Sequence, residues 1–549
     1  SGGEHARMAP SRPLTRRGFV CAAGGTVGAI VAALPALAQA PGGADEAAGD
    51  AARWLDGDRP SALCREAVSL LAAAEVHGLD PRDYEAAMLE RWLAGADEGR
   101  PEVAMRLAAA LVPALRRFLA DLAFGRVDPR SVHQRFSVAP RAGFDPAAAL
   151  NRALARGRLD EAVAAAAPPL PAYARLVDAL AAMRALAGHR AWAQTLPPLP
   201  ASPGSSAGRL DPGAAWAGLP TLAERLALLG DFAPRSSADR PPTRYEGALV
   251  DAVRAFQSRH GLTVDGVVGR ATLAALEVTP AARARQIALT MERLRWTPLV
   301  QGPRMVVVNI PEFVLRAYEV VDGTIRMHAQ MRVIVGGALD KQTPLFDERM
   351  RAIEFSPYWN VPPSIARRET VPRLRRDPGY WQSQGFEFVD RRGAADAVLT
   401  PAKLDAVLAG TLRIRQRPGP VNALGDIKFV FPNRDHIFLH HTPAVGLFER
   451  DRRDFSHGCI RVADPVALAR FVMAGMPGWD DARIRAAMQS GTSTTVALAH
   501  PVPVLIAYAT VLVEQGRVHF FTDLYGNDAR LQAALDARRT RPPPGLATP

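Results

Sequence analysis

The residues best suited to chemistry lie in the segment Ser456-His457-Gly458-Cys459-Ile460-Arg461-Val462 and in His440, nineteen positions before the cysteine. A thiolate is a far stronger nucleophile than a thiol, and a nearby imidazole can ionise a cysteine. The unperturbed thiol has a pKa of roughly 8.5, so an imidazole is expected to lower the pKa of Cys459. The segment therefore predicts acyl transfer through a cysteine nucleophile.

Three histidines are close enough in sequence to serve as the base: His440, His441 and His457. If Ile437 and Leu439 point into the core, side-chain alternation places His441 with them and Phe438 and His440 on the other face. Gly458 permits a sharp turn in which the main-chain N–H groups of Gly458 and Cys459 converge on one oxygen, as an oxyanion hole requires. Periodicity alone leaves the choice of base open.

The chain contains three cysteines, Cys21, Cys64 and Cys459. Cys21 lies in an N-terminal segment that is expected to be removed. Cys64 and Cys459 could form a disulfide in an oxidising compartment. Because Cys64 falls in a helical pattern and Cys459 in the reactive segment, we expect a buried Cys64 and a free, reactive Cys459.

Composition limits the classes of function. The chain has 549 residues, 48% of them hydrophobic, which is enough for several domains with their own cores. The formal net charge is +12, but lysines and arginines are scattered among acidic residues. This scatter argues against nucleic-acid binding and fits a general attraction to anionic surfaces such as a cell wall. No apolar run of 18 residues follows the N-terminal segment, so no later membrane span is expected.

The first forty residues are typical of an export signal. The stretch Thr15-Arg16-Arg17-Gly18-Phe19-Val20 resembles the twin-arginine signal, an uncharged Ala/Gly/Val-rich stretch follows, and Ala38-Gln39-Ala40 forms a cleavage pattern. A permanent anchor is the alternative, but the stretch is only weakly apolar. We expect export to the periplasm by the twin-arginine route, with no more than transient membrane association through this segment.

The remaining chain predicts a multidomain α+β protein. Helical periodicity and a proline-rich break give a helical domain, a linker and a small module in which Gly261, Gly266 and Gly269 supply turns. Short β-branched runs from Met305 onward predict a β-rich catalytic domain, a sandwich or partly closed barrel. The expected parts are 1–40 signal, 41–195 helical domain completed by helix 281–297, 196–214 linker, 215–280 three-helix module, 300–530 catalytic domain with a helical and loop insertion at 365–408, and 531–549 tail.

Several strings resemble the L,D-transpeptidases of the YkuD type, and the YcbB-like branch most closely. They are Ile437-Phe438-Leu439-His440-His441-Thr442-Pro443, Phe455 to Val462, Tyr358-Trp359-Asn360-Val361-Pro362, Arg415-Gln416, Pro418-Gly419-Pro420 and Asn422-Ala423-Leu424-Gly425. The small module, with Phe256-Gln257, His260-Gly261-Leu262 and Asp265-Gly266, resembles a peptidoglycan-binding module. The resemblance covers about residues 60 to 530.

The resemblance implies a role for each motif residue. Cys459 is expected to be the nucleophile and His440 the base, with Gly458 and Cys459 donating to the oxyanion and with Ser456 and His457 shaping the other side of the site. Arg461 is expected to fix the loop or a substrate carboxylate, and Tyr358 and Trp359 to form core or pocket wall. The residues expected to contact substrate are Ser456, Arg461, Tyr358, Trp359, Asn360 and His441. His441 stands where close relatives carry Asp, so the group that orients the base is open, a backbone carbonyl being one candidate.

The implied reaction is peptidoglycan cross-linking. Cys459 attacks the L-centre carbonyl of meso-diaminopimelate in a tetrapeptide stem, D-Ala leaves, and the amine of a second stem resolves the thioester to give a 3-3 cross-link. No metal or organic cofactor is expected, and carbapenems should acylate the same sulfur. The alternatives are a same-fold hydrolase, such as an L,D-carboxypeptidase or an amidase-type trimming enzyme, and a non-catalytic wall-binding protein. A papain-like protease is disfavoured by the sequence around Cys459.

Overall fold

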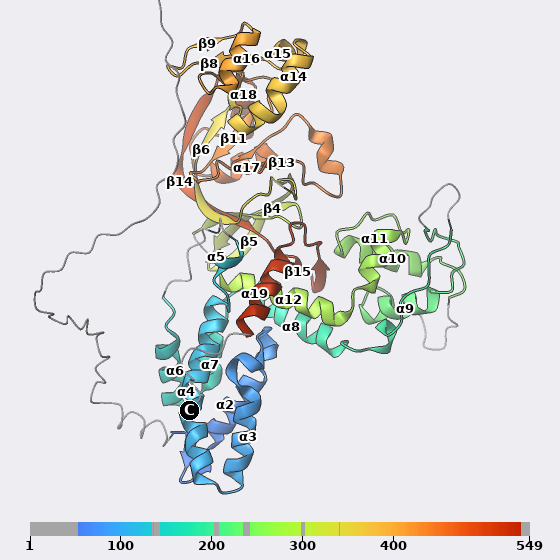
Figure 1. Ribbon diagram of the computed structural model, residues 1–549, viewed down its shortest axis with the longest axis vertical. Coiled ribbons are helices and arrows are strands. Elements are labelled where there is room, and N and C mark those ends of the chain that lie inside the picture. Colours follow the sequence, from blue (N-terminus) through green and yellow to red (C-terminus); the bar gives the residue numbers. More distant parts are fainter. Residues whose placement is uncertain are drawn as a thin grey trace, which may run out of the picture. The chain divides into compact units, whose positions relative to one another are not determined.

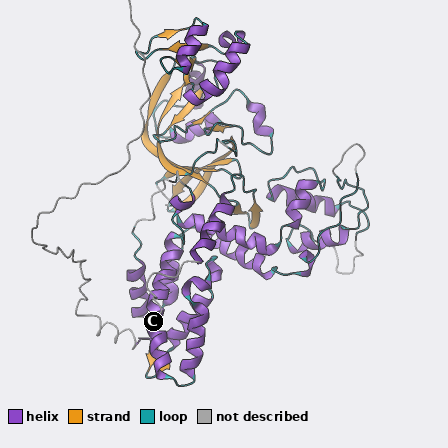
Figure 2. Ribbon diagram, in the orientation of Figure 1, coloured by secondary structure: helices purple, strands orange, loops and turns teal. Residues whose placement is uncertain are grey.

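The computed structural model describes residues 53–133, 136, 143–201, 208–233, 242–297, 302–339 and 341–539. The predicted export signal, residues 1–40, lies outside the described residues. Helices dominate the N-terminal half of the chain and strands the C-terminal half (Figure 2). This division agrees with the predicted multidomain α+β class.

The N-terminal region is a helical domain. Long helix α4 (Pro101–Phe124) places Leu107, Leu111, Phe118 and Leu122 on one fully buried face, and it ends at Gly125, where φ is 87°. Helix α12 (Pro280–Arg295) packs on α8 and adds Ile287 and Met291 to the same core (Figure 1). The other helices are α2 (Ala62–Ala72), α3 (Ala86–Asp97), α5 (Pro129–Val132), α6 (Pro146–Arg156), α7 (Leu159–Ala166) and α8 (Pro171–Ala185).

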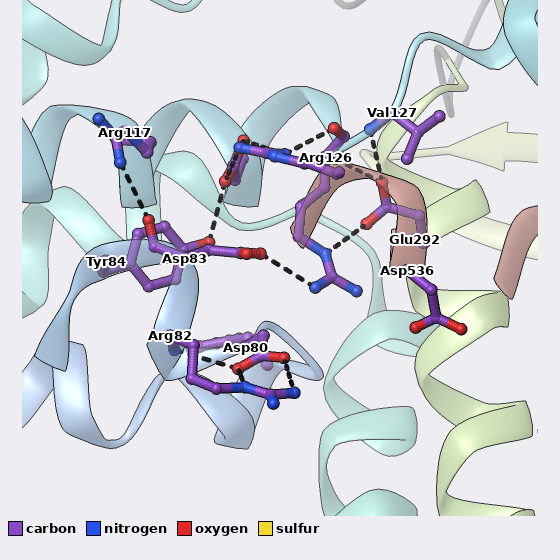
Figure 3. A network of polar contacts seen from close by, with 12 residues as sticks. Asp80, Arg82, Asp83, Tyr84, Arg117, Arg126, Val127, Glu292 and Asp536 are labelled. Atoms are coloured by element: carbon purple, nitrogen blue, oxygen red, sulfur yellow. Dashed lines mark hydrogen bonds and ion pairs between the residues drawn. The ribbon is translucent and has the colours of Figure 1, made fainter. Parts of the chain in front are cut away.

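A buried polar network ties α12 to the turn that follows α4 (Figure 3). Glu292 is fully buried, and its carboxylate accepts hydrogen bonds from the main-chain N–H groups of Arg126 and Val127 and from the Arg295 guanidinium, the last at 2.9 Å. Arg126 also donates to Asp83 at 3.2 Å. Since buried charges are tolerated only with partners, this network fixes the start of the segment that leads into α5.

The small module consists of α9 (Leu219–Leu228), α10 (Ala248–Arg259) and α11 (Arg270–Glu277). Leu222, Val253, Phe256 and Leu276 form its core. The predicted linker is not a free connection in its described part, because Leu196 and Leu210 are buried in this core as well. The proline-rich composition of 196–214 gave no sign of this packing.

The β-rich region is a closed barrel of eight strands, in the order β11-β12-β13-β5-β4-β3-β14-β6. The predicted β-rich domain is confirmed, and of the two predicted forms, a sandwich or a partly closed barrel, it is the barrel that is present. Its closure is complete, and strand β14 was not predicted. Closure leaves no exposed edge. The strands are β3 (Arg304–Asn309), β4 (Val314–Val321), β5 (Thr324–Ile334), β6 (Phe346–Phe355), β11 (Ile427–Val430), β12 (Leu439–His440), β13 (Ile460–Val462) and β14 (Thr494–Ala507).

An inserted subdomain interrupts the barrel between β6 and β11. It has a core of its own around Trp381, Phe388 and Ile414 and a four-stranded sheet in the order β7-β10-β8-β9. The prediction of only helices and loops in 365–408 is wrong, because β8 and β9 lie there. The elements are β7 (Trp359–Asn360), α13 (Pro363–Ile365), the π-helical turn η4 (Ala366–Thr370), α14 (Val371–Arg376), α15 (Gly379–Ser383), β8 (Phe386–Val389), β9 (Ala395–Asp396), α16 (Pro401–Leu408) and β10 (Arg413–Gln416).

The C-terminal part is ordered beyond the barrel. Helix α19 (Asn527–Arg539) follows the hairpin of β15 (Val511–Glu514) and β16 (Arg517–Phe520), and α17 (Pro465–Val472) and α18 (Asp481–Gln489) precede β14. The predicted tail begins inside α19, where Leu531 and Leu535 are buried against Leu289 and Trp296. Among the described residues, no helix is long and apolar enough to span a membrane.

Candidate active site

The site is positioned by two short neighbouring strands. β12 and β13 run parallel, with Leu439 opposite Ile460 and His440 opposite Arg461. Leu439 and Ile460 are fully buried in the barrel core, so alternation turns His440 and Arg461 to the other face. Cys459 immediately precedes β13, and all three side chains line one cavity.

That cavity has a volume of about 1000 Å³. Of the predicted residues, it is lined by His440, Ser456, His457, Gly458, Cys459, Arg461 and Trp359. Sequence reasoning missed the rest of the wall, which includes Lys341 from the barrel, Arg368 and Glu369 from the insertion, His133 from the helical domain, and Arg530 from α19. No cluster that could hold a metal ion occurs among the residues that the structure describes.

His440 is held as a neutral imidazole. Its side chain is buried, and its Nδ1 lies 2.5 Å from the carbonyl oxygen of His441. Since a carbonyl oxygen only accepts, Nδ1 carries the proton and Nε2 keeps its lone pair. Burial, reinforced by the positive charge of Arg461, lowers the pKa of His440 to about 3. A backbone carbonyl, that of His441, therefore holds the His440 ring in place.

Cys459 rests as a thiol. Its Sγ donates to the carbonyl oxygen of His436 at 3.7 Å. Burial raises the pKa of Cys459, and the Phe438 N–H with the charges of Lys428 and Arg461 offsets only part of that effect. The expectation that an imidazole lowers this pKa is therefore wrong for the resting site, because His440 is neutral and adds no positive charge.

No disulfide joins the two described cysteines: both are free, and Cys64 is buried. Burial also raises the pKa of Cys64, to about 11, so this thiol stays protonated. The free Cys459 of the sequence analysis is present, and Cys64 is an inert core residue.

The turn before Cys459 is fixed by its own hydrogen bonds. Gly458 adopts φ 114°, and its N–H donates to Ser456 Oγ at 3.2 Å while its carbonyl accepts from Thr343 Oγ1 at 2.8 Å. Ser456 Oγ in turn donates to the Cys459 carbonyl. The N–H groups of Gly458 and Cys459 were expected to converge on one oxygen. They do not do so here, because the N–H of Gly458 already donates to Ser456 Oγ.

His457 joins the turn to the insertion. Its Nε2 lies 2.7 Å from Glu369 Oε1 and 2.6 Å from Lys341 Nζ, and Lys341 pairs with Glu369 at 3.0 Å. Partial burial acts to raise the pKa of Glu369, but the hydrogen bonds from His457 and Lys341 outweigh it and lower that pKa. The ring of His457, which was expected to shape one side of the site, is therefore engaged by Lys341 and Glu369.

The remaining predicted residues separate into three places. Trp359 lines the main cavity. The guanidinium of Arg415 lies over the Tyr358 ring, 4.0 Å from the ring centroid. The Asn360 side chain is exposed on β7. The predicted contacts of Tyr358 and Asn360 with substrate are absent from the cavity lining. A periodicity argument could not separate these adjacent residues, because β7 pairs with the insertion sheet and not with the barrel.

His441 lies in a second cavity of about 300 Å³, with its Nδ1 2.6 Å from Asp426 Oδ1. It does not line the cavity that holds Cys459, contrary to its assignment as a substrate contact. Gly425 makes room for it, because a Cβ atom there would lie 2.8 Å from the main-chain carbon of His441.

Comparison with known proteins agrees with this architecture. Residues 303–485 match the L,D-transpeptidase catalytic domain of the YkuD family, residues 46–180 match the Scaffold domain, and residues 218–276 match the "Putative peptidoglycan binding domain". Over 253 residues the chain is 31% identical to a "Putative L,D-transpeptidase" of Haemophilus influenzae. That alignment covers 46% of this chain, and the chain spans about half, 49%, of that relative's length.

Among solved structures, a fused Zn-dependent amidase/peptidase/peptidoglycan-binding domain-containing protein from Clostridium acetobutylicum is 11% identical, with a TM-score of 0.17 over 55% of this chain and 100% of its own.

Proposed function

We propose that this chain, which contains a YkuD L,D-transpeptidase catalytic domain together with Scaffold and peptidoglycan-binding domains, is a peptidoglycan transpeptidase that forms 3-3 cross-links. The observation that carries the proposal is the pairing of β12 with β13, which sets His440 opposite Arg461, next to Cys459, on one cavity wall. It brings a cysteine thiol, a neutral imidazole with an accepting Nε2, and the Arg461 guanidinium together in a space of about 1000 Å³.

The first half-reaction forms a thioester. Cys459 Sγ attacks the carbonyl carbon of the L-centre of diaminopimelate while His440 Nε2 takes the thiol proton. Because both groups rest neutral, the proton moves as the carbon–sulfur bond forms, and the imidazolium that results donates it to the departing nitrogen of D-Ala. The proton is thus conserved and the peptide bond is replaced by a thioester.

The second half-reaction resolves the thioester. The side-chain amine of a second stem attacks the same carbonyl carbon, His440 takes a proton from that amine, and Cys459 leaves as the thiol. In this proposal the main-chain N–H of Cys459 and the guanidinium of Arg461 stabilise the negative charge that develops on the carbonyl oxygen. The Arg461 Nε is buried and has no hydrogen-bond partner among the described residues.

A hydrolytic enzyme is the second candidate. Water as the acceptor would give trimmed stems from the same acyl-enzyme, and the size of the cavity admits either acceptor. A wall-binding protein without catalysis is the third, and it is disfavoured because the thiol and its base both line the cavity. The proposed compartment is the periplasm, reached by the twin-arginine route, and carbapenems are proposed to acylate Cys459.

Incubation with disaccharide-tetrapeptide separates these functions. Dimers that carry a 3-3 bond, detected by mass spectrometry and lost in Cys459→Ala, are expected. Disaccharide-tripeptide alone would identify the hydrolase, and unchanged tetrapeptide with no meropenem adduct on intact mass would refute both enzymes.

A further inference from the structure

Three guanidinium groups that lack a carboxylate partner face the same cavity. Arg461 comes from the barrel, Arg368 from the insertion and Arg530 from α19. None of the three forms an ion pair with any of the residues that the structure describes, whereas nearby Arg332, Arg375 and Arg415 are all paired. Unpaired arginines gathered on one cavity are typical of sites that bind carboxylate or phosphate.

The charge of the described cavity wall supports an anionic ligand. Lys341, Arg368, Arg461 and Arg530 stand against two carboxylates, Glu369 and Asp435. Glu369 is engaged by Lys341 at 3.0 Å, so it does not neutralise the arginines. The wall of the cavity that holds Cys459 thus carries excess positive charge.

Arg530 belongs to a wall that the barrel does not supply. It lies in the first turns of α19, which packs on α5 of the helical domain. Its guanidinium has one neutral contact, with the Asn527 amide oxygen at 3.3 Å, which leaves most of its donors available. Figure 1 shows α5 and α19 next to each other below the barrel strands.

His133, just after α5, lines the cavity on the same wall. Its ring packs edge-on against Trp296, and its buried Nε2 has no hydrogen-bond partner among the described residues. Burial, together with the charges of Arg293 and Arg530, lowers the pKa of His133 to about 4, so the ring is neutral at physiological pH. A buried polar nitrogen without a partner has a free-energy cost that a bound polar group would remove.

We propose that Arg530, with His133 beside it, forms a subsite that binds a carboxylate of the peptidoglycan stem, so that the helical domain and α19 take part in substrate recognition. This inference rests on the proposed function and extends it by naming the group that is recognised. The subsite positions the stem while Cys459 and His440 carry out the chemistry. Arg530 is therefore a binding residue outside the YkuD domain match, residues 303–485.

Binding to an inactive protein tests the subsite without turnover. In the full chain carrying Cys459→Ala, calorimetric titration with disaccharide-tetrapeptide is compared for Arg530→Gln and for Arg485→Gln, an exposed helical arginine that lines neither described cavity. We expect Arg530→Gln to weaken the Kd about tenfold, as loss of a charge-assisted hydrogen bond should, and Arg485→Gln to leave it unchanged. Equal Kd values for the two variants would overturn the proposal.

A chemical change in the ligand identifies the recognised group. Stems amidated at one carboxylate at a time are titrated against both proteins. Amidation of the recognised carboxylate is expected to weaken the Kd of the Cys459→Ala protein about tenfold. It should not weaken the Kd of the protein that also carries Arg530→Gln, because the guanidinium that binds this carboxylate is already missing there. If every amide costs both proteins the same, the subsite does not exist.

The two proposals fail in different ways. A parent that binds tetrapeptide through Arg530 but forms neither adduct nor product would refute the transpeptidase and leave the subsite standing. If the wild-type protein makes dimers and Arg530→Gln has the same KM and kcat as wild type, the transpeptidase proposal stands and the subsite is refuted. Arg530→Lys keeps the positive charge but not the planar set of guanidinium donors, so it should recover part of the affinity lost in Arg530→Gln. This recovery would show that weaker binding is not due to misfolding.

Discussion

The Nε2 atom of His457 lies 2.7 Å from Glu369 Oε1, a contact between the turn that carries the nucleophile and the inserted subdomain. Because the ring nitrogen of His457 is engaged by a carboxylate and by Lys341, we expect this residue to position the turn before Cys459. The contact also makes Glu369, for which the sequence offers no motif, part of the support of the active site. Both side chains remain partly exposed, so the contact is of modest strength.

The first prediction concerns this contact. His457→Gln and Glu369→Gln should each slow acylation of Cys459 by meropenem by no more than about tenfold, since a partly exposed pair contributes roughly 1 kcal/mol or less. The double variant should be no slower than the slower single variant, because both changes remove one interaction. Intact-mass time courses give the rates. If the fold-reduction of the acylation rate in the double variant equals the product of the two single fold-reductions, the residues act separately.

The second prediction concerns His440. His440→Gln should lower the rate of meropenem acylation by roughly 10²–10⁴-fold, the usual contribution of a general base. The matched control is His436→Gln, because His436 contributes a main-chain carbonyl to Cys459 and not its ring. Acylation that proceeds at the wild-type rate in His440→Gln would remove this residue from the mechanism.

The third prediction is a pH dependence of thiol reactivity. Since burial raises the pKa of Cys459 above its ordinary value, the thiolate should form only at alkaline pH. The rate of alkylation by iodoacetamide should therefore increase continuously from pH 7 to pH 9. A plateau that begins below pH 7 would instead indicate a thiolate–imidazolium pair. Cys459→Ala serves as the blank, with the buried Cys64 as the remaining described thiol.

The fourth prediction concerns the buried network of Figure 3. Glu292→Ala should lower the free energy of unfolding by about 3–5 kcal/mol, because it leaves the fully buried guanidinium of Arg295 without its carboxylate. The matched control is Glu90→Ala, an exposed position on helix α3, which should change it by about 0.5 kcal/mol or less. Thermal melts followed by circular dichroism measure both. A Glu292→Ala protein as stable as the control would show that the network contributes little.

The fifth prediction is loss of stability in mild acid. The folded protein holds His77 and His133 with pKa values of about 4 and His440 at about 3, mainly through burial. The unfolded chain, with ordinary values near 6.5, binds these protons first, so unfolding takes up protons as the pH falls from 6.5 towards 4.

One group opposes this trend. Burial raises the pKa of Asp121 to about 6, so the folded state gains a proton there over the same window and offsets one of the three histidines. Urea denaturation at pH 6.5 and pH 4.5 should therefore still show lower stability at the acidic value. Equal or greater stability at pH 4.5 would mean that the histidines are accessible to protons in the folded state.

Local motifs were sufficient to single out Cys459 and His440 as candidates and to predict the approximate class of each domain, because those depend on residue type and short-range periodicity. His440 and Cys459 share a cavity because β12 and β13 are register neighbours, a pairing that their alternating patterns allow. The hydrogen-bond partner of the His440 ring is a main-chain oxygen, which no side-chain motif encodes.

The missed features depend on contacts between distant segments. Arg530 and His133 reach the cavity because α19 packs on α5, nearly 400 positions earlier in the chain. Tyr358, Asn360 and His441 were assigned to the site because they stand in strings that resemble the family. In the structure β7 pairs with the strands of the insertion, and His441 lines the second cavity. Burial reversed the expected ionisation of Cys459, and burial is a property of the whole fold.

Helix α12 has a practical consequence for protein production. Its Arg293 pairs with Asp528 of α19, and Arg538 of α19 reaches Asp121 of α4 at 2.8 Å. A shortened recombinant protein that starts at the first barrel strand would retain α19 but lose the partners of both side chains and the apolar surface that covers Leu531. Expression of the barrel by itself should therefore yield aggregated material, whereas boundaries that keep the helices from residue 53 onward should give soluble protein.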